Sequence, residues 1–367
     1  MATETITQTS NLIFSSLPPF PSTVPTAPLH RLSLQKLRTD PEESDRLFSS
    51  SKDLGFFYFD LRGDDEGESL LQDADKLFSM APKLYDLGRE ELSKYDYKSK
   101  GSYVGYKGFG SAVVDEQGNL DRNEFYNIPK DEFLGISPSS SWFAHPQVLH
   151  DHKDVIVSYM NTSHSIVTLI LQHLTKNLHL PPGTLTSLHR KSHPSGDQVR
   201  LVKSPPQPPS DQRTALGKHT DFGSITILFN RLGGLQILPP PSLTPAGQEP
   251  QWTYVKPLPG HCIVNLGDAM VKFTNGLLRS NIHRVVSPPG EQAKETRYSL
   301  VYFARPEDDI ILRRLEGSNV IPELEVEEEA MSSKEWIKLQ AMRLRNIKPG
   351  MSDEERKRVW EDSGRGE

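Results

Sequence analysis

Residues 219–229 read His-Thr-Asp-Phe-Gly-Ser-Ile-Thr-Ile-Leu-Phe, a polar tripeptide followed by β-branched and aromatic residues. Such a run is typical of a β-strand. If the tripeptide is also extended, His219 and Asp221 point to the same face, with Cα atoms roughly 6.5 Å apart. An imidazole and a carboxylate at that spacing can bind one metal ion from one side. The tripeptide alone is common by chance, so its significance depends on the sequence downstream.

Several short segments with strand character follow, separated by glycine and proline. The paired glycines within residues 230–234 are expected to close a hairpin with a second strand at 235–237. Further strands are expected at residues 252–255, 262–268, 281–286 and 297–303. Short strands at close spacing favour an antiparallel barrel or a double-sheet jelly roll.

A second imidazole and an arginine occur in the last two of these segments. His283 completes a set of two histidines and one carboxylate, the arrangement that binds non-heme Fe(II) and leaves coordination positions open. In residues 297–303, strand alternation places Arg297 and Ser299 on one face. A guanidinium binds a carboxylate through two parallel hydrogen bonds, and a neighbouring hydroxyl can donate a third.

The order of these motifs resembles that of the Fe(II)- and 2-oxoglutarate-dependent dioxygenases of the isopenicillin N synthase and plant flavonoid-enzyme type. The resemblance rests on His-x-Asp, the distant histidine and Arg-x-Ser, and it spans residues 26–308. Further similar segments are 54–58, 123–128, 265–268, 274–276 and 283–285. The Ser-Pro-Pro-Gln-Pro at 204–208 and the Arg-Pro at 305–306 resemble fungal members.

The resemblance implies an α+β fold with a mainly β core, a double-stranded β-helix (jelly roll) braced by helices, one of them long and central. It implies Fe(II) bound by His219, Asp221 and His283, and 2-oxoglutarate bound by Arg297 and Ser299. O2 is then the oxidant, and ascorbate is expected to stimulate turnover. The implied reaction is hydroxylation, desaturation or ring rearrangement of a small organic molecule in secondary metabolism, with succinate and CO2 as co-products.

One position departs from the family pattern. Plant relatives carry Asn-x-Tyr ahead of two prolines, and the tyrosine hydroxyl contacts 2-oxoglutarate. Val202 and Ser204 occupy those places here, so Ser204 is assigned as a shorter cosubstrate contact. By strand alternation Arg200 shares their face and is a candidate for the substrate cavity, although an exposed strand-end arginine fits equally well.

The resemblance also assigns a largely aromatic set of residues to the substrate cavity. These are Tyr103, Tyr106, Phe125, Asn127, Phe222, Leu235 and Phe303, and Arg200 and Arg305 are added as candidates. Aromatic walls with few polar anchors suit a mid-sized organic molecule. The two arginines favour an acidic or phenolic group on it.

The expected organisation along the chain has four parts. Residues 1–25 are rich in Ser, Thr and Pro and are expected to be disordered. Residues 26–150 form a mixed α/β N-terminal region, 151–310 a helix and the jelly-roll core, and 311–367 a C-terminal helical extension or lid.

Apolar periodicity predicts helices within two stretches, and a capping motif predicts a third. Residues 70–92 are expected to be helical with an interruption at Pro82. Residues 148–178 are expected to form one long helix. Residues 332–335 read Ser-Ser-Lys-Glu, a capping box for a helix reaching Arg345.

Composition excludes several classes of protein. The chain has 367 residues, 35% hydrophobic and 25% charged, and no apolar run long enough to cross a bilayer. A formal charge of −6 argues against nonspecific nucleic-acid binding. The single cysteine, Cys262, and the absence of a visible secretory signal favour a cytoplasmic protein. A monomer that binds a small-molecule substrate is expected.

Three other functions fit part of the pattern. An oxidase similar to isopenicillin N synthase shares the fold, the triad and Arg-x-Ser without using 2-oxoglutarate. A catalytically inactive ligand-binding relative would be expected to lose the triad. Zinc hydrolysis can use two histidines and one carboxylate, but it leaves Arg297 and Ser299 without a role.

Overall fold

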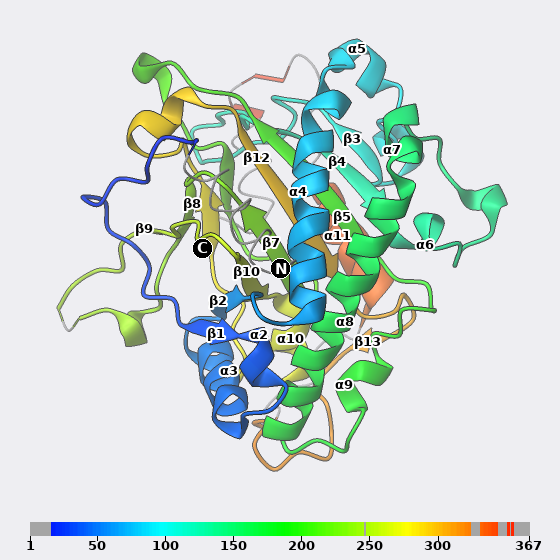
Figure 1. The fold of residues 1–367 in the computed structure, drawn as a ribbon, viewed down its shortest axis with the longest axis vertical. Helices are drawn as coiled ribbons and strands as arrows, with labels where there is room; N and C mark the ends of the chain where they lie inside the picture. The colour runs from blue at the N-terminus through cyan, green and yellow to red at the C-terminus, as the bar shows by residue number, and fades with distance from the viewer. Residues whose placement is uncertain (1–15, 246, 324–330, 344–350, 353, 356–367) are drawn as a thin grey trace.

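Two β-sheets form the centre of the molecule (Figure 1). The computed structural model describes residues 16–245, 247–323, 331–343, 351–352 and 354–355. The larger sheet has the order β1-β2-β10-β7-β12-β5-β4-β3, and the smaller has the order β6-β11-β8-β9. Within both sheets every pairing is antiparallel except that of β1 with β2. This arrangement confirms the expected α+β fold with a jelly-roll core.

The strands are short, as their spacing in the sequence predicts. Those of the larger sheet are β1 (Arg31–Ser33), β2 (Phe56–Asp60), β3 (Gly105–Lys107), β4 (Glu124–Pro129), β5 (Gln198–Ser204), β7 (Ile225–Asn230), β10 (His261–Leu266) and β12 (Arg297–Ala304). Those of the smaller sheet are β6 (Leu216–His219), β8 (Leu235–Ile237), β9 (Thr253–Tyr254) and β11 (His283–Val285). A separate pair consists of β13 (Ile311–Leu312) and β14 (Met331–Ser332).

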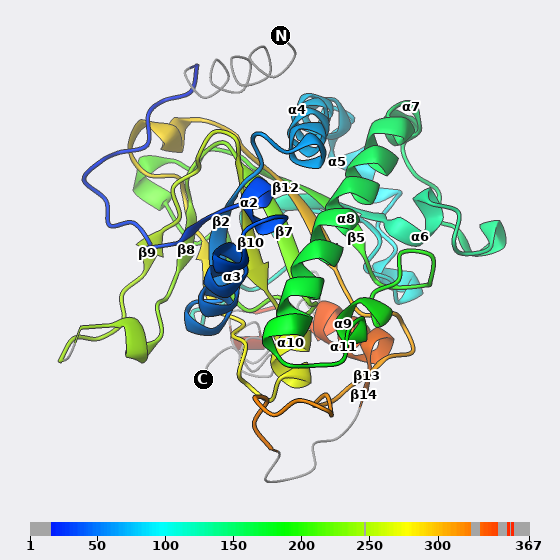
Figure 2. The ribbon, with the colours of Figure 1, turned by 60° about the horizontal axis from the view of Figure 1, so that its bottom comes forward.

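Helices cover the outer face of the larger sheet (Figure 2). The main ones are α3 (Pro41–Asp53), α4 (Asp65–Tyr85) and α8 (Lys153–Asn177). The buried residues of α8 recur at helical spacing and join the main hydrophobic core: Ile156, Met160, Val167, Ile170, Leu171 and Leu174. The shorter helices are α2 (Leu34–Leu37), α5 (Gly88–Ser93), α6 (Lys130–Phe133), α7 (Gln147–Asp151), α9 (Thr184–Ser187), α10 (Asp268–Phe273) and α11 (Ser333–Arg343).

The predicted helices differ from the observed ones at their breaks. The long central helix is present, but His152 leaves the helical region with φ −113° and ψ 18°, so α7 and α8 are separate. The interruption expected at Pro82 is wrong, because α4 accommodates that residue in its last turn. The chain instead breaks before Gly88, whose φ of 80° is left-handed.

The hairpin expected at residues 230–237 is also wrong. Strand β7 pairs with β10 and β12, whereas β8 pairs with β9 and β11, so the paired glycines carry the chain from one sheet to the other. Gly234 has a φ of 107°, and a Cβ there would lie 2.7 Å from the carbonyl oxygen of Val286. Only glycine therefore fits this crossing.

The N-terminal segment that the structure describes packs on the smaller sheet and its loops. The Phe20 ring meets that of Tyr254 edge to face at 6.1 Å, and Gln292 Nε2 donates to the carbonyl oxygen of Pro18 at 2.9 Å. The expected disorder therefore does not extend to residues 18–25, and residues 1–15 lie outside the described part of the chain.

The capping box at the start of α11 is confirmed. Glu335 N donates to Ser332 Oγ at 3.3 Å, and Ser332 N donates to Glu335 Oε2 at 3.2 Å. The predicted continuation to Arg345 lies outside the described residues. Among the helices that are described, none combines the length and apolarity needed to cross a membrane.

Candidate metal centre and adjoining cavities

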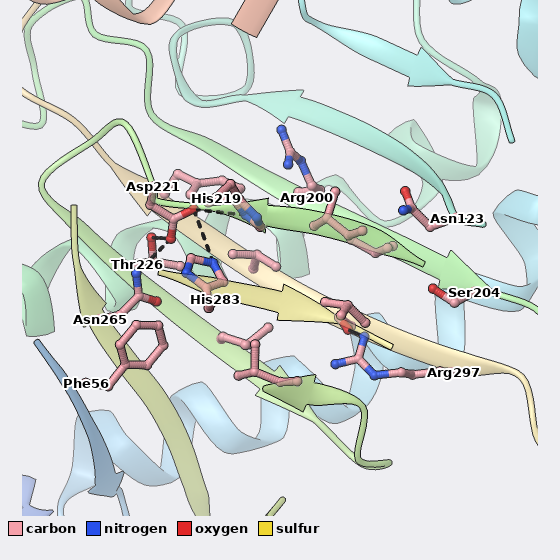
Figure 3. Close-up of a pocket in the computed structure, with 18 residues that line it drawn as sticks. Phe56, Asn123, Arg200, Ser204, His219, Asp221, Thr226, Asn265, His283 and Arg297 are labelled. Carbon is pink, nitrogen blue, oxygen red and sulfur yellow. Dashed lines mark hydrogen bonds and ion pairs between the residues drawn. The ribbon is translucent and has the colours of Figure 1, made fainter. Parts of the chain in front are cut away.

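Three side chains with metal-binding atoms meet between the two sheets (Figure 3). His219 ends β6, its strand partner His283 begins β11, and Asp221 follows in the connection to β7. The Nε2 atoms of His219 and His283 lie 4.0 and 3.9 Å from Asp221 Oδ1. In the part of the chain that the structure describes, this is the one such group. The expected strand conformation thus ends at His219, but the predicted convergence is present.

Backbone carbonyls orient both imidazoles. His219 Nδ1 lies 2.8 Å from the carbonyl oxygen of Gly217, and His283 Nδ1 lies 3.1 Å from that of Asn281. A carbonyl can only accept, so Nδ1 carries the proton and donates in each ring. The Nε2 lone pairs are then directed at the space beside Asp221, as metal ligands require.

Asp221 is held by its second oxygen. Asp221 Oδ2 accepts from Thr226 Oγ1 at 2.7 Å and from Asn265 Nδ2 at 2.8 Å, which leaves Oδ1 facing the imidazoles. Burial opposes ionisation, but the His283 and His219 imidazoles and these two hydrogen bonds keep the pKa of Asp221 below its usual value. Two imidazoles with Nε2 facing an ionised carboxylate form a donor set that suits Fe(II).

Arg297 lies in the same cavity, away from the triad (Figure 3). Its side chain is 3% exposed. Nε donates to the carbonyl oxygen of Gly233 at 2.7 Å, Nη1 to Ser299 Oγ at 2.5 Å, and Nη2 to Asn230 Oδ1 at 2.9 Å. All three acceptors are neutral, and among the described residues no carboxylate pairs with this guanidinium.

The charge on Arg297 is therefore buried without a counter-ion from any described residue. Burial lowers its pKa to about 10, so the group remains a cation at neutral pH. A buried cation is costly unless an anion joins it. The site fits a ligand carboxylate.

Ser204 lies opposite Arg297 in the pairing of β5 with β12. Its hydroxyl is buried, and neither that oxygen nor Asn230 Nδ2 has a hydrogen-bond partner among the described residues. Unpaired buried polar atoms are uncommon and point to an absent partner. Both atoms lie beside Arg297, in agreement with a polar ligand there.

A cavity of about 640 Å³ connects the triad with Arg297 and Ser299. The residues predicted for the site that line it are Ser204, Arg200, Leu235 and Phe303, together with the triad. A second cavity of about 860 Å³ opens on the other side of His219 and Asp221. It is lined by Tyr103, Phe125, Asn127, Phe222, Arg305 and again Arg200 and Phe303, all as predicted.

The assignment of Tyr106 to the substrate cavity is wrong. Its ring lies in the main hydrophobic core, and its hydroxyl donates to Glu124 Oε2 at 2.5 Å. Tyr106 pairs with Tyr126, and successive strand residues face opposite sides, so Phe125 and Asn127 point into the cavity while Tyr126 points away. The neighbouring Lys107 lies on the cavity face instead.

Sequence reasoning missed several polar residues in or beside these cavities, among them Lys107, Asp121 and Asn230. Lys107 and Asp121 form a buried ion pair in the second cavity. Asn230 binds both Arg297 and Ser299, with Ser299 Oγ donating to its Oδ1 at 2.9 Å. Placing Lys107 on the cavity face requires the register of β3, and placing Asn230 beside Arg297 requires the pairing of β7 with β12. The sequence alone gives neither.

Comparisons with known proteins agree with this geometry. Residues 195–306 match the model of the 2OG-Fe(II) oxygenase superfamily, and residues 24–145 match the N-terminal region of non-haem dioxygenases in morphine synthesis. A 2-oxoglutarate-dependent dioxygenase of Aspergillus fumigatus is 36% identical, over 87% of this chain and 86% of that protein. The 2-oxoglutarate-dependent dioxygenase gloE of Glarea lozoyensis is 30% identical, over 80% and 84%.

Solved structures share the fold at lower identity. Neurospora crassa T7H in complex with alpha-KG superposes with a TM-score of 0.70 and 20% identity, over 85% of this chain and 95% of that one. A 2OG-Fe(II) oxygenase family protein from Caulobacter crescentus gives 0.70 and 24%, over 88% and 100%. The jelly roll and its helical cover are therefore shared.

Proposed function

Because the chain belongs to the 2OG-Fe(II) oxygenase superfamily, we propose that His219, Asp221 and His283 bind Fe(II) and that Arg297 binds the far carboxylate of 2-oxoglutarate. The protein is a 2-oxoglutarate-dependent dioxygenase. The observation that supports the residue roles best is the buried guanidinium of Arg297. It has no carboxylate partner among the described residues and shares a cavity with the triad.

Iron and 2-oxoglutarate, when bound, supply the oxidising chemistry, with succinate and CO2 as co-products. The chain's own residues position and shield that chemistry. Thr226 and Asn265 fix the carboxylate of Asp221, and backbone carbonyls fix both imidazoles. Ser299 and Ser204 offer hydroxyls beside Arg297 for the cosubstrate carboxylate.

The second cavity is the proposed substrate site. It opens at His219 and Asp221, and its aromatic walls Phe125, Phe222 and Phe303 exclude water from the reacting C–H bond. The proposed reaction is hydroxylation, desaturation or ring rearrangement of a small organic molecule in fungal secondary metabolism. We further propose that the enzyme works as a cytoplasmic monomer.

The decisive experiment measures succinate. Purified protein supplied with Fe(II), 2-oxoglutarate, O2 and a compound that it oxidises should form one succinate per product, and ascorbate should raise the turnover number. Zn(II) in place of Fe(II) should give none. Oxidation of the compound without succinate would instead favour an oxidase similar to isopenicillin N synthase.

A further inference from the structure

We propose that the substrate is a carboxylic acid whose carboxylate binds Arg305, assisted by Tyr103 and Arg200, while its apolar body lies between the aromatic walls. This inference rests on the proposed function, because it places the substrate in the cavity beside the triad. It adds the chemical class of the substrate and the residues that select it.

Arg305 is a second buried arginine with no counter-ion in the described part of the chain. Its side chain is 5% exposed, and it forms no ion pair within the described residues. Nη1 donates to the carbonyl oxygen of Gly196, and Nε is buried with no hydrogen-bond partner among the described residues. A buried charged donor whose N–H makes no hydrogen bond lowers the stability of the folded protein. A carboxylate entering from the cavity would remove that cost.

The backbone around Arg305 is shaped to hold this side chain. A Cβ on Gly196 would lie 3.0 Å from Arg305 Cδ and 2.9 Å from the Tyr103 hydroxyl oxygen. A Cβ on Gly223 would lie 2.9 Å from Arg305 Cγ and 2.7 Å from the carbonyl oxygen of Ala304. Two glycines thus let the backbone close around the arginine stem from two segments. The side chain is fixed before any ligand arrives.

The end of β12 is anchored by a buried carboxylate that leaves the guanidinium available. The backbone N–H of Arg305 donates to Asp197 Oδ1 at 2.7 Å, and the Tyr302 hydroxyl donates to Oδ2 at 2.8 Å. Both oxygens of Asp197 are therefore used by partners other than the Arg305 side chain.

Arg200 brings a second cation to the same wall. Its guanidinium carbon lies 4.1 Å from the centre of the Phe125 ring and 4.8 Å from that of Phe303. Arg305 lies 5.5 Å from the same Phe303 ring and 5.3 Å from that of Tyr103. Arg200 Nε also donates to Asn127 Oδ1 at 2.7 Å. Two guanidinium groups that share one aromatic ring favour an anion between them.

Among the described residues, the acidic side chains of the cavity have partners other than Arg305. Asp121 pairs with Lys107 and accepts from the backbone of Ser111 and Ala112. Asp221 is engaged at the triad. The planar fork of a guanidinium matches a carboxylate, and the Tyr103 hydroxyl can donate a further hydrogen bond.

Strand alternation puts this site opposite the cosubstrate. Arg297, Ser299, Val301, Phe303 and Arg305 occupy alternate positions, and each lines at least one of the two cavities. His219 and Asp221 line both cavities. A substrate anchored at Arg305 therefore presents its far end to the metal from the side away from Arg297.

The test compares acids with their uncharged counterparts. A panel of aliphatic and arylalkanoic acids, each with its methyl ester and primary amide, is added to the anaerobic protein loaded with Fe(II) and 2-oxoglutarate. Thermal shift reports binding, and succinate formation in air reports productive binding. Acids should bind and stimulate succinate formation at least roughly tenfold better than their esters and amides, which lose a charge-assisted contact.

Variants then assign the effect to Arg305. Arg305→Gln should raise the KM of the best acid roughly tenfold to a hundredfold and leave that of its ester unchanged. Arg305→Lys should restore part of the loss, and Tyr103→Phe should cost a few-fold. Arg62→Gln is the matched control, because Arg62 pairs with Asp60 away from the cavities.

Each outcome decides the proposal. If esters bind as well as acids, if no acid binds at millimolar concentration, or if Arg305→Gln discriminates like the wild type, the carboxylate site is wrong. The 2-oxoglutarate thermal shift is measured for every variant and reports on folding and on the cosubstrate site. If the wild type shows no such shift, the proposed function fails, and this failure is distinct from one confined to substrate choice.

Discussion

Arg297 begins β12 and Arg305 directly follows it; both arginines are buried, yet their surroundings differ. Arg297 donates to Gly233, Ser299 and Asn230, so its orientation is fixed by three neutral acceptors. Arg305 donates through Nη1 to the carbonyl oxygen of Gly196, and its Nε has no hydrogen-bond partner within the described residues. Because the cosubstrate is the same in every turnover, its binding site can hold Arg297 in one fixed orientation before the cosubstrate binds. A substrate site can leave more donors for the ligand itself to satisfy.

The largest effect should come from removing a ligand of the metal site, which lies between the Arg297 site and the Arg305 site. Asp221→Ala deletes the anionic metal ligand, so iron content should fall to background and succinate formation should drop more than roughly 100-fold, beyond the loss typical of outer-shell changes. Iron is measured by chelator absorbance on purified protein. His261→Ala is the control, since His261 is also buried but binds Arg31 and the carbonyl oxygen of Pro259. Full iron content in Asp221→Ala would refute the triad.

Arg297→Met should weaken binding of 2-oxoglutarate without affecting the metal site. Losing the bidentate partner of a carboxylate costs about 3 kcal/mol, or roughly a 100-fold weaker affinity for 2-oxoglutarate. Iron content should not change. The ligand-free protein should be at least as stable as the wild type, because an unpaired buried cation is gone. Titration calorimetry and thermal melts measure both. Loss of iron would show that the two roles are not separate.

Asn230→Asp should make Arg297 resemble an ordinary paired arginine. The new carboxylate would accept from Nη2, stabilise the ligand-free protein and compete with the cosubstrate. Affinity for 2-oxoglutarate should fall about tenfold, equivalent to about 1.4 kcal/mol. The Arg305 end should keep its KM for substrate. A higher affinity for 2-oxoglutarate would contradict the proposal that Arg297 pairs with the carboxylate of a ligand.

Ser204→Ala should give the smallest effect and calibrates the others. Its hydroxyl has no partner among the described residues, so the ligand-free protein should keep its melting temperature. A neutral hydrogen bond to the cosubstrate contributes about 0.5–1.5 kcal/mol, so affinity should fall by less than roughly tenfold. No change at all in the KM for 2-oxoglutarate would remove Ser204 from the site.

Local motifs allowed much of the site to be predicted from the sequence. The shared face of Arg297 and Ser299 and the cavity position of Arg200 follow from alternation within single strands. The triad was predicted from the two-histidine, one-carboxylate pattern and its order along the chain. Contacts that depend on pairing between distant strands could not be predicted from the sequence. A shift of one residue reverses the face of a side chain, which is why Tyr106 was misplaced and Lys107 missed. The crossing at Gly233 and Gly234 resembles a hairpin turn until the partners of β8 are known.

The N-terminal segment around Pro18 and Phe20 should be kept in any truncated form of this enzyme. Pro18 accepts from Gln292 Nε2, Gln292 Oε1 accepts from the N–H of Gly233, and Gly233 accepts from Arg297 Nε. The Phe20 ring also lies against Gly233. The family match begins at residue 24, so a protein trimmed to that match would cut this relay at its outer end. Residues that carry no motif thus help to set how firmly the cosubstrate arginine is held.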